Sequence, residues 1–493
     1  MTLLLIAGCV AALAQISYGL MQRSHKGPQY ETEAISFRQV LRNVDDTQYY
    51  GNLTVGGQVL NAVFDTGSLE LIVISAQCSN CGQRSRLYKA HHPSHEYGER
   101  TVLHSYGSGS ISSREAYDAV GLGPFQDKQA PFWEVYDAAM PVLSVSDFEV
   151  IVGLSPIPWN LTLMRNHAVD NEQSYANLQK MMGIPEFSIC LGQEPQSPGM
   201  IRWNDPLPYA RPGDFTEVHL MNVAGPTKQW IAPLSNVRLG DMHLACVGQR
   251  ACGAIIDSGT SLLAVPPSVA NRLRDAVGHL DADCSNIHNL PDLRFTLGGV
   301  ELSLPPASYV FKATGELSET LAQYVELGAS ALTLSSSCQV LVMTASLSMD
   351  GLGETWILGM PFFRKYYTSF LQHPPRLSIA EATSDCEPAT QELIEASLEM
   401  DSQEMGRTSR HVDVSKLRAP YWLRRTTVEA SSDTSRAGPK DVRKGQLDDS
   451  ALETGARHEV GPSRHIDDLQ SGLQQVPLEL RLGVSIGERE SLN

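Results

Sequence analysis

The sequence predicts an all-β protein of two similar lobes with a few short helices. At 493 residues the chain is longer than one hydrophobic core usually needs, so two or more lobes are expected. From about 35 to 386, short β-branched and apolar runs alternate with Gly, Pro, Asn and Asp, which is the pattern of strands and turns. A short motif centred on Asp65 recurs around Asp257, which indicates an internal duplication.

The chain begins with a short apolar run. Residues Leu3 to Ala14 are too few to span a bilayer comfortably and end in the small-x-small pattern Ala12-Leu13-Ala14, so a signal peptide is predicted over 1–14. The segment Ile6 to Cys9 also loosely resembles a lipoprotein acceptor site, which is an open alternative. No later apolar run is long enough for a transmembrane anchor, so none is expected. The expected location is the secretory pathway, with the protein secreted or held in an acidic vacuolar or lysosome-like compartment.

Charge, cysteine count and sequons limit the partners and the compartment. The net charge of -17 argues against nucleic acid as a partner, and a monomer is expected. Of nine cysteines, Cys9 lies in the predicted signal peptide, and the remaining eight form an even set that suits an oxidising compartment. Asn52 and Asn160 begin Asn-Leu-Thr sequons and are candidate glycosylation sites.

The elements of the body follow from local pattern. Helices are expected over Ser174 to Met182 and Pro267 to Val277, because each run follows a helix-start signal. Strands are expected in four apolar, β-branched runs: Leu71 to Ser75, Glu149 to Leu154, Phe187 to Leu191 and Ala254 to Asp257.

The predicted boundaries divide the body into two lobes and a tail. The N-terminal lobe is expected over 35–198 and the C-terminal lobe over 199–386. Residues 387–493 are rich in Ser, Thr, Glu, Asp and Arg and are expected to be a mostly disordered tail, dispensable for catalysis. In that tail the run from Ala419 to Leu423 stands out, either as a docking patch or as an isolated aromatic cluster.

The duplicated motif carries the chemistry. Phe64-Asp65-Thr66-Gly67-Ser68 recurs as Ile256-Asp257-Ser258-Gly259-Thr260, and each copy is followed by an apolar pair and a glycine, at Ile151-Val152-Gly153 and Ile357-Leu358-Gly359. One Asp-Thr-Gly is commonly a simple β-turn. Two copies, each after an apolar strand, instead predict that each lobe contributes one carboxyl group to a shared site.

Two carboxyl groups held close together cannot both ionise, so one pKa falls and the other rises. The ionised group can act as general base on a shared water, while the protonated group hydrogen-bonds the scissile carbonyl. Gly67 and Gly259 would let backbone amides approach the carboxylates. The remaining motif hydroxyls would support the pair: Thr66 and Ser258 by bracing the turns to each other, Ser68 and Thr260 by orienting the outer carboxylate oxygens.

These motifs resemble a known family. The runs 61–68 and 254–263 look like the two active-site signatures of pepsin-like aspartic proteases, whose paired carboxyl groups are the standard example of such shifted pKa values. Tyr49-Tyr50-Gly51, Trp356-Ile357-Leu358-Gly359 and 362–367 extend the resemblance over roughly 47–386. The resemblance implies a bilobal pepsin-like fold and an aspartic endopeptidase acting at acidic pH on polypeptides bound extended between the lobes. It implies no cofactor and no metal.

The resemblance also implies a flap. Residues 105–110 are similar to the hairpin that closes over substrate in this family, which makes Tyr106, Gly107 and Ser108 candidate substrate-binding residues. The sequence departs from the family at Ile72, where a tryptophan usually bonds the flap tyrosine, so that indole donor is expected to be missing. Met360 and Leu371 each replace a usual Asp, which affects supporting loops.

Disulfides are implied mainly by the resemblance. Cys246–Cys252 and Cys284–Cys338 match family bridges, and Cys190–Cys386 resembles a bridge of beta-secretase. Cys78 and Cys81 have the spacing of a zinc half-site, but no partner pair follows, so a small disulfide loop is favoured.

The family also implies a zymogen. Here only about 15–34 is available as a prosegment, which is short for blocking a cleft, although Arg23, His25 or Lys26 lies within it. Two alternatives stay open: a catalytically silent binding protein on the same fold, and a beta-secretase-like processing enzyme of narrow specificity.

Overall fold

The computed structural model describes residues 35–82, 86–158, 162–163, 174–221, 229–248, 252–325, 333–348, 353–390, 392–393 and 408–420. The predicted signal peptide, the short prosegment and the sequon residue Asn160 lie outside these residues.

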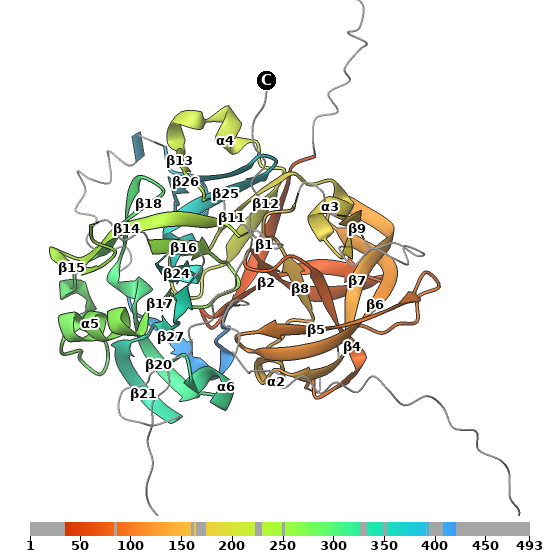
Figure 1. The fold of residues 1–493 in the computed structure, drawn as a ribbon, viewed down its shortest axis with the longest axis horizontal. Helices are drawn as coiled ribbons and strands as arrows, with labels where there is room; N and C mark the ends of the chain where they lie inside the picture. Colours follow the sequence, from red (N-terminus) through yellow and green to blue (C-terminus); the bar gives the residue numbers. More distant parts are fainter. Residues whose placement is uncertain are drawn as a thin grey trace, which may run out of the picture. The chain divides into compact units, whose positions relative to one another are not determined.

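A thirteen-stranded sheet forms the N-terminal lobe and continues into the C-terminal part of the body (Figure 1). Its strands, in spatial order, are β13 (Thr216–Val218), β26 (Pro375–Glu381), β25 (Tyr366–Gln372), β11 (Glu186–Cys190), β12 (Gly199–Trp203), β1 (Phe37–Val44), β2 (Gln48–Val55), β3 (Gln58–Asp65), β8 (Val150–Gly153), β4 (Leu71–Ser79), β7 (Phe125–Ala139), β6 (Gly109–Leu122) and β5 (Glu96–Tyr106). The lobe boundary predicted at 198/199 therefore falls between two paired strands, β11 and β12, of one sheet.

Further sheets build the C-terminal lobe. A nine-stranded sheet comprises β19 (Val300–Leu304), β18 (Leu293–Leu297), β14 (Ile231–Leu239), β16 (Cys252–Ile256), β24 (Glu354–Leu358), β17 (Ala264–Val265) and β22 (Met343–Thr344), with β15 (Met242–Ala245) on β14 and β23 (Leu347–Ser348) on β24. A three-stranded sheet comprises β21 (Thr333–Val340), β20 (Val310–Glu316) and β27 (Arg410–Asp413), and β9 (Thr162–Leu163) pairs with β10 (Ser174–Tyr175). The four predicted strand runs correspond to β4, β8, β11 and β16.

The helices are short. They are α2 (Val142–Val145), α3 (Leu178–Met182), α4 (Leu207–Ala210), α5 (Pro267–Val277), α6 (Glu319–Ala322) and α7 (Met360–Lys365), with 3₁₀ turns η1 (Pro212–Asp214), η2 (Ile287–Asn289), η3 (Pro306–Ser308) and η4 (Val414–Lys416).

Of the two predicted helices, α5 has the predicted bounds and α3 does not. The prediction of a helix from Ser174 was wrong by four residues, because Ser174 belongs to β10 and Asn177 caps the helix. The Asn177 backbone is extended and its side chain accepts a hydrogen bond from the Lys180 amide, which starts the helix at Leu178.

The internal duplication appears as two equivalent strand pairs. β3 runs parallel to β8 with Asp65 opposite Gly153, and β16 runs parallel to β24 with Ile256 opposite Leu358. One continuous apolar core contains side chains of both pairs, including Phe64 and Ile256. Each motif aspartate therefore stands at the buried end of its strand.

Residues 408–420 form ordered structure within the range where a mostly disordered tail is expected. β27 pairs in parallel with β20, where Arg410 lies opposite Phe311 (Figure 1, blue). Val412, Val414 and Leu417 are fully buried in a second apolar cluster with side chains of β20 and α6. This apolar burial is the physical reason that the segment is ordered.

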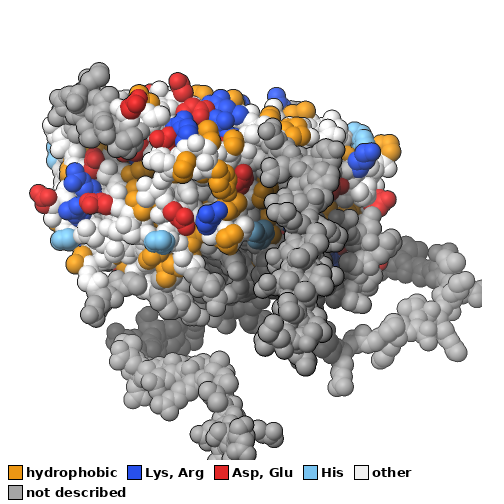
Figure 2. Space-filling model, turned by 90° about the horizontal axis from the view of Figure 1, so that it is seen from above, with side chains coloured by type: hydrophobic (Ala, Val, Ile, Leu, Met, Phe, Trp, Pro, Cys, Tyr) orange, Lys and Arg blue, Asp and Glu red, His pale blue; other side chains and the backbone are white. Residues whose placement is uncertain are grey.

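On the face drawn in Figure 2, Lys and Arg side chains lie beside Asp and Glu side chains. Within the described residues, no helix is both long and apolar enough to cross a membrane.

Candidate active site

Two buried carboxyl groups meet where the duplicated strands end. Asp65 is the last residue of β3, and Asp257 directly follows β16. Their exposed fractions are only 3 % and 0 %, so both groups are removed from bulk water. The Asp65 side chain hydrogen-bonds that of Asp257. The structure thus brings together the two aspartates that the sequence predicted to share a site.

Reciprocal hydrogen bonds join the two turns. The Thr66 hydroxyl donates to the Ile256 carbonyl (2.9 Å) and accepts from the Ser258 amide (2.9 Å). In the mirror arrangement, the Ser258 hydroxyl donates to the Phe64 carbonyl (2.7 Å) and accepts from the Thr66 amide (3.1 Å). Because each hydroxyl is buried and bonds the other lobe twice, the brace fixes the relative position of the two carboxyl groups.

Each carboxyl group is also held within its own turn. Asp65 accepts from the Gly67 amide (3.0 Å) and the Ser68 hydroxyl (2.8 Å). Asp257 accepts from the Gly259 amide (2.8 Å) and the Thr260 hydroxyl (2.7 Å). Gly67, Ser68, Gly259 and Thr260 therefore contact the carboxyl groups, whereas Thr66 and Ser258 brace the two turns.

Glycine is required in both turns by the approach of the opposite lobe. A Cβ atom on Gly67 would lie 2.6 Å from the carboxyl carbon of Asp257, and a Cβ on Gly259 would collide with the Asp65 carboxyl group. Any larger residue would therefore push the two carboxyl groups apart.

The electrostatics of the pair are asymmetric. Burial, and then the negative charge of Asp65, raise the pKa of Asp257 well above its ordinary value, while hydrogen bonds from Thr260 and Gly259 act in the opposite direction. Asp257 is therefore the group that retains its proton, and the pair can hold one acid and one base side by side.

Comparison with known proteins identifies this arrangement. Residues 48–382 match the family described as eukaryotic aspartyl protease. The chain belongs to this family. It is 28% identical to pepsin A of Bos taurus over 364 residues, covering 71% of this chain and 89% of the relative. It is 27% identical to renin-2 of Mus musculus (70% and 82% covered) and 25% identical to pregnancy-associated glycoprotein 1 of Ovis aries (72% and 88% covered). The chain is accordingly an aspartic endopeptidase with a bilobal pepsin-like fold.

In this protease β5 and β6 form the hairpin that the sequence analysis expects to be a flap, and Tyr106 pairs with Gly109 at its end. Tyr106 is buried, and Gly107 and Ser108 form the connecting turn. The turn lies against residues 419 and 420 of the same chain.

Ile72 stands where the family usually has a tryptophan, and the indole of Trp133 from another strand lies beside it. Ile72 is buried in β4 and lies opposite Trp133 of β7. The Trp133 Nε1 donates to Glu70 Oε1 (2.7 Å), and burial raises the pKa of Glu70. The sequence analysis missed Trp133, because strand register across the sheet, rather than any local motif, brings it here.

His104, which the sequence analysis also missed, packs on this indole. The ring of His104 on β5 lies edge-on to Trp133 at 5.5 Å, and its Nδ1 is 4.0 Å from Glu70. Burial lowers the pKa of His104 to about 4. Above about pH 4 the imidazole is therefore mainly neutral, and it packs as an uncharged ring against Trp133.

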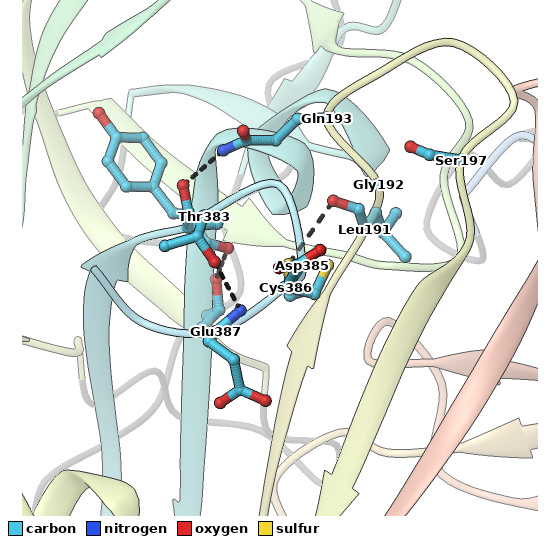
Figure 3. The surroundings of a disulfide bond; sticks show 12 residues. Leu191, Gly192, Gln193, Ser197, Thr383, Asp385, Cys386 and Glu387 are labelled. Carbon is cyan, nitrogen blue, oxygen red and sulfur yellow. Dashed lines mark hydrogen bonds between the residues drawn. A yellow bond between two sulfur atoms is a disulfide. The ribbon is translucent and has the colours of Figure 1, made fainter. Parts of the chain in front are cut away.

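In the part of the protease that the structure describes, there are four disulfides: Cys78–Cys81, Cys190–Cys386, Cys246–Cys252 and Cys284–Cys338. These are the pairs stated above from the resemblance and the cysteine spacing. Cys190–Cys386 joins the end of β11 to a turn in which the Glu387 amide donates to the Thr383 hydroxyl (3.1 Å; Figure 3). Cys246–Cys252 closes the loop that leads into β16.

Proposed function

We propose that Asp65 and Asp257 hydrolyse peptide bonds by activating one shared water at acidic pH. Asp65, ionised, takes a proton from the water, and Asp257, protonated, donates a hydrogen bond to the scissile carbonyl. The proton then passes to the leaving amine as the tetrahedral intermediate collapses. The observation that carries this proposal is the raised pKa of Asp257 beside a second buried carboxyl group. Neither side chain forms a covalent intermediate.

The substrate is proposed to be an extended polypeptide. Tyr106, Gly107 and Ser108 of the flap cover it, and Thr66, Gly67, Ser68, Ser258, Gly259 and Thr260 hold the carboxyl pair beneath it. Support comes from the backbone groups of the flap turn and of the residues after Asp257, which face each other closely enough to hold one main chain between them.

The remaining proposals concern targeting, processing and glycosylation of the chain. Residues 1–14 direct it into the secretory pathway, 15–34 are a prosegment, and the folded lobes occupy 35–198 and 199–386. The protein is secreted or delivered to an acidic compartment as a monomeric zymogen, with glycans at Asn52 and Asn160. Support comes from the four disulfides and from the exposed position of Asn52.

The test is replacement of each carboxyl group separately. Asp65→Asn and Asp257→Asn are each expected to lower kcat on a peptide by about 10³-fold or more, because the two groups act as a unit. Circular dichroism and Tm must show that both variants fold. Asp241→Asn, on the exposed turn between β14 and β15, is the matched control and should keep full activity. Substantial turnover by a folded single variant would contradict the shared-water mechanism.

A further inference from the structure

Residues 408–420 run from the C-terminal lobe to the carboxyl pair. After β27 the chain turns through η4, where the Lys416 carbonyl accepts from Gln48 Nε2 (2.5 Å) of the N-terminal lobe. The main chain then passes between the residues after Asp257 and the flap turn. The segment therefore contacts the active-site elements of both lobes.

Two cations anchor the beginning of the segment to the N-terminal lobe. Arg410 is buried and pairs with Asp46 Oδ1 at 2.6 Å. Its guanidinium also donates to the carbonyls of 192–194. Of these residues, Gly192 and Gln193 are labelled in Figure 3, next to the Cys190–Cys386 disulfide. Lys416 pairs with Asp45, and their hydrogen bond raises the pKa of Lys416. These contacts fix where the segment enters the site.

The main chain of 418–420 is hydrogen-bonded from both sides, as the main chain of an extended substrate peptide would be. The Arg418 amide donates to the Ser261 hydroxyl (2.8 Å), and the Ser261 amide donates to the Arg418 carbonyl (3.1 Å). On the other side, the Ala419 amide donates to the Ser108 hydroxyl (2.9 Å), and the Gly107 amide donates to the Pro420 carbonyl (2.8 Å). Flap groups that would bind a substrate backbone are thus already engaged.

The Arg418 side chain lies at the carboxyl pair. It is buried, with Nη2 at 3.8 Å from Asp65 Oδ2 and the guanidinium 5.3 Å from the ring centre of Phe148. Its Nη1 has no hydrogen-bond partner within the described part of the chain. A purely structural contact would not need a cation beside the carboxylate that acts as the base. The guanidinium instead forms a long ion pair with the carboxylate proposed as the base.

We propose that residues 408–420 are an internal ligand of the substrate site, with Arg418 at its centre, and that they inhibit the protease until they are displaced. This rests on the proposed function, because inhibition has meaning only if the carboxyl pair is catalytic. The buried apolar residues of β27 and η4 keep the segment near the site, and Arg418 to Pro420 block it.

The first experiment changes the blocking residue in the full chain. Arg418→Glu places a negative charge beside Asp65 and should expel residues 418–420, while Val412, Val414 and Leu417 keep their packing. The expected result is an increase in kcat/KM on a short peptide of at least about ten-fold. Arg272→Glu, on the exposed side of α5, is the matched control and should leave the rate unchanged. A folded Arg418→Glu variant with the wild-type rate or less would overturn the proposal.

The second experiment measures whether residues 416–420 are held in the substrate site, without using the protein's own activity. Trypsin cuts after Lys416 and Arg418 in an accessible chain, so both bonds should be cut at least about ten-fold more slowly in the folded protein than in a synthetic peptide of residues 408–420. In Arg418→Glu, a Glu-specific protease should cut after position 418 at nearly the rate seen in a synthetic peptide of 408–420 that carries the same change, while cleavage after Lys416 stays slow because Leu417 remains packed. Cleavage after Arg418 in the wild-type chain as fast as in the peptide would contradict occupancy.

The same synthetic peptide separates the two proposals. Added to a full-length Val412→Asp/Arg418→Glu chain, in which a buried anchor and the blocking residue are both changed so that 408–420 leaves its place, it should inhibit competitively, whereas a peptide with Glu in place of Arg418 should not. If no form of the chain hydrolyses any peptide, the proposed function fails. Fluorescence-detected binding of the labelled peptide to the folded double variant still decides the internal-ligand proposal in that case, because absence of binding overturns it.

Discussion

At the scale of single residues, the fully buried Asp257 carries the main electrostatic cost of the site. The protonated form of its carboxyl group is more stable than the ionised form in the folded protein, since burial and the neighbouring Asp65 charge both oppose ionisation. Because the pKa of Asp257 is higher in the folded than in the unfolded state, protonation of this group stabilises the fold. That contribution to the free energy of unfolding is complete below the ordinary Asp pKa and is lost as pH rises through the folded-state pKa. The site is therefore a local source of instability at neutral pH.

Replacement of this one group tests the electrostatic cost. Asp257→Asn is neutral at every pH and keeps a hydrogen-bonding side chain, so its Tm should nearly equal that of the parent chain at pH 3. At pH 7 the variant should melt about 3 °C or more above the parent chain. Scanning calorimetry at both pH values, with Asp241→Asn as the exposed control, makes the comparison. A Tm difference that is the same at both pH values would contradict the electrostatic assignment.

The residues of the carboxyl pair could be predicted from the sequence, because their chemistry lies within two contiguous motifs. Residues such as Trp133 and His104 could not be predicted in the same way. Trp133 reaches Glu70 because β4 and β7 pair in a register that no local pattern specifies. His104 is an ordinary residue in an amphipathic hairpin until that register places it on the indole.

At the scale of elements, the disulfides close loops of very different length. Cys190–Cys386 closes a loop of 196 residues and Cys246–Cys252 one of 6. Since a cross-link removes more entropy from the unfolded chain when its loop is longer, the first should contribute about 3 kcal/mol more.

Paired serine variants test that difference. Cys190→Ser/Cys386→Ser should lower the free energy of unfolding more than Cys246→Ser/Cys252→Ser does, as measured by urea denaturation. The Cys284–Cys338 pair, with a separation of 54, should fall between them. The reverse order would show that local strain or packing, not chain entropy, dominates these bridges.

The element that sequence analysis did not foresee is β27 with η4. Val412, Val414 and Leu417 are only a few apolar residues in a polar stretch, too short for a period to identify a strand. Their burial depends on β20, about a hundred residues earlier in the chain, so the pairing is a tertiary effect. The prediction that 387–493 is mostly disordered did not foresee the order of residues 408–420, and the dispensability of the range for catalysis stays a prediction.

At the scale of the whole body, one sheet and one brace connect the lobes. The thirteen-stranded sheet carries strands from residues 37 to 381, so the sequence boundary between the lobes is not a boundary between sheets. The Thr66–Ser258 brace then aligns the two strand ends to hydrogen-bonding accuracy. The bilobal fold was predictable because the duplicated motif requires two equivalent strand pairs, whereas the shared sheet depends on long-range pairings.

The most direct measurement of the central claim is the pH dependence of kcat/KM for one peptide, on the full chain and on Arg418→Glu. Catalysis by a carboxyl pair that shares one proton predicts a bell-shaped profile. Its falling limb should lie above the ordinary Asp pKa of 3.8, because the last proton leaves Asp257, whose pKa is raised. A profile with a single ionisation that rises to a plateau at neutral pH, in either form of the chain, would contradict the shared-water mechanism.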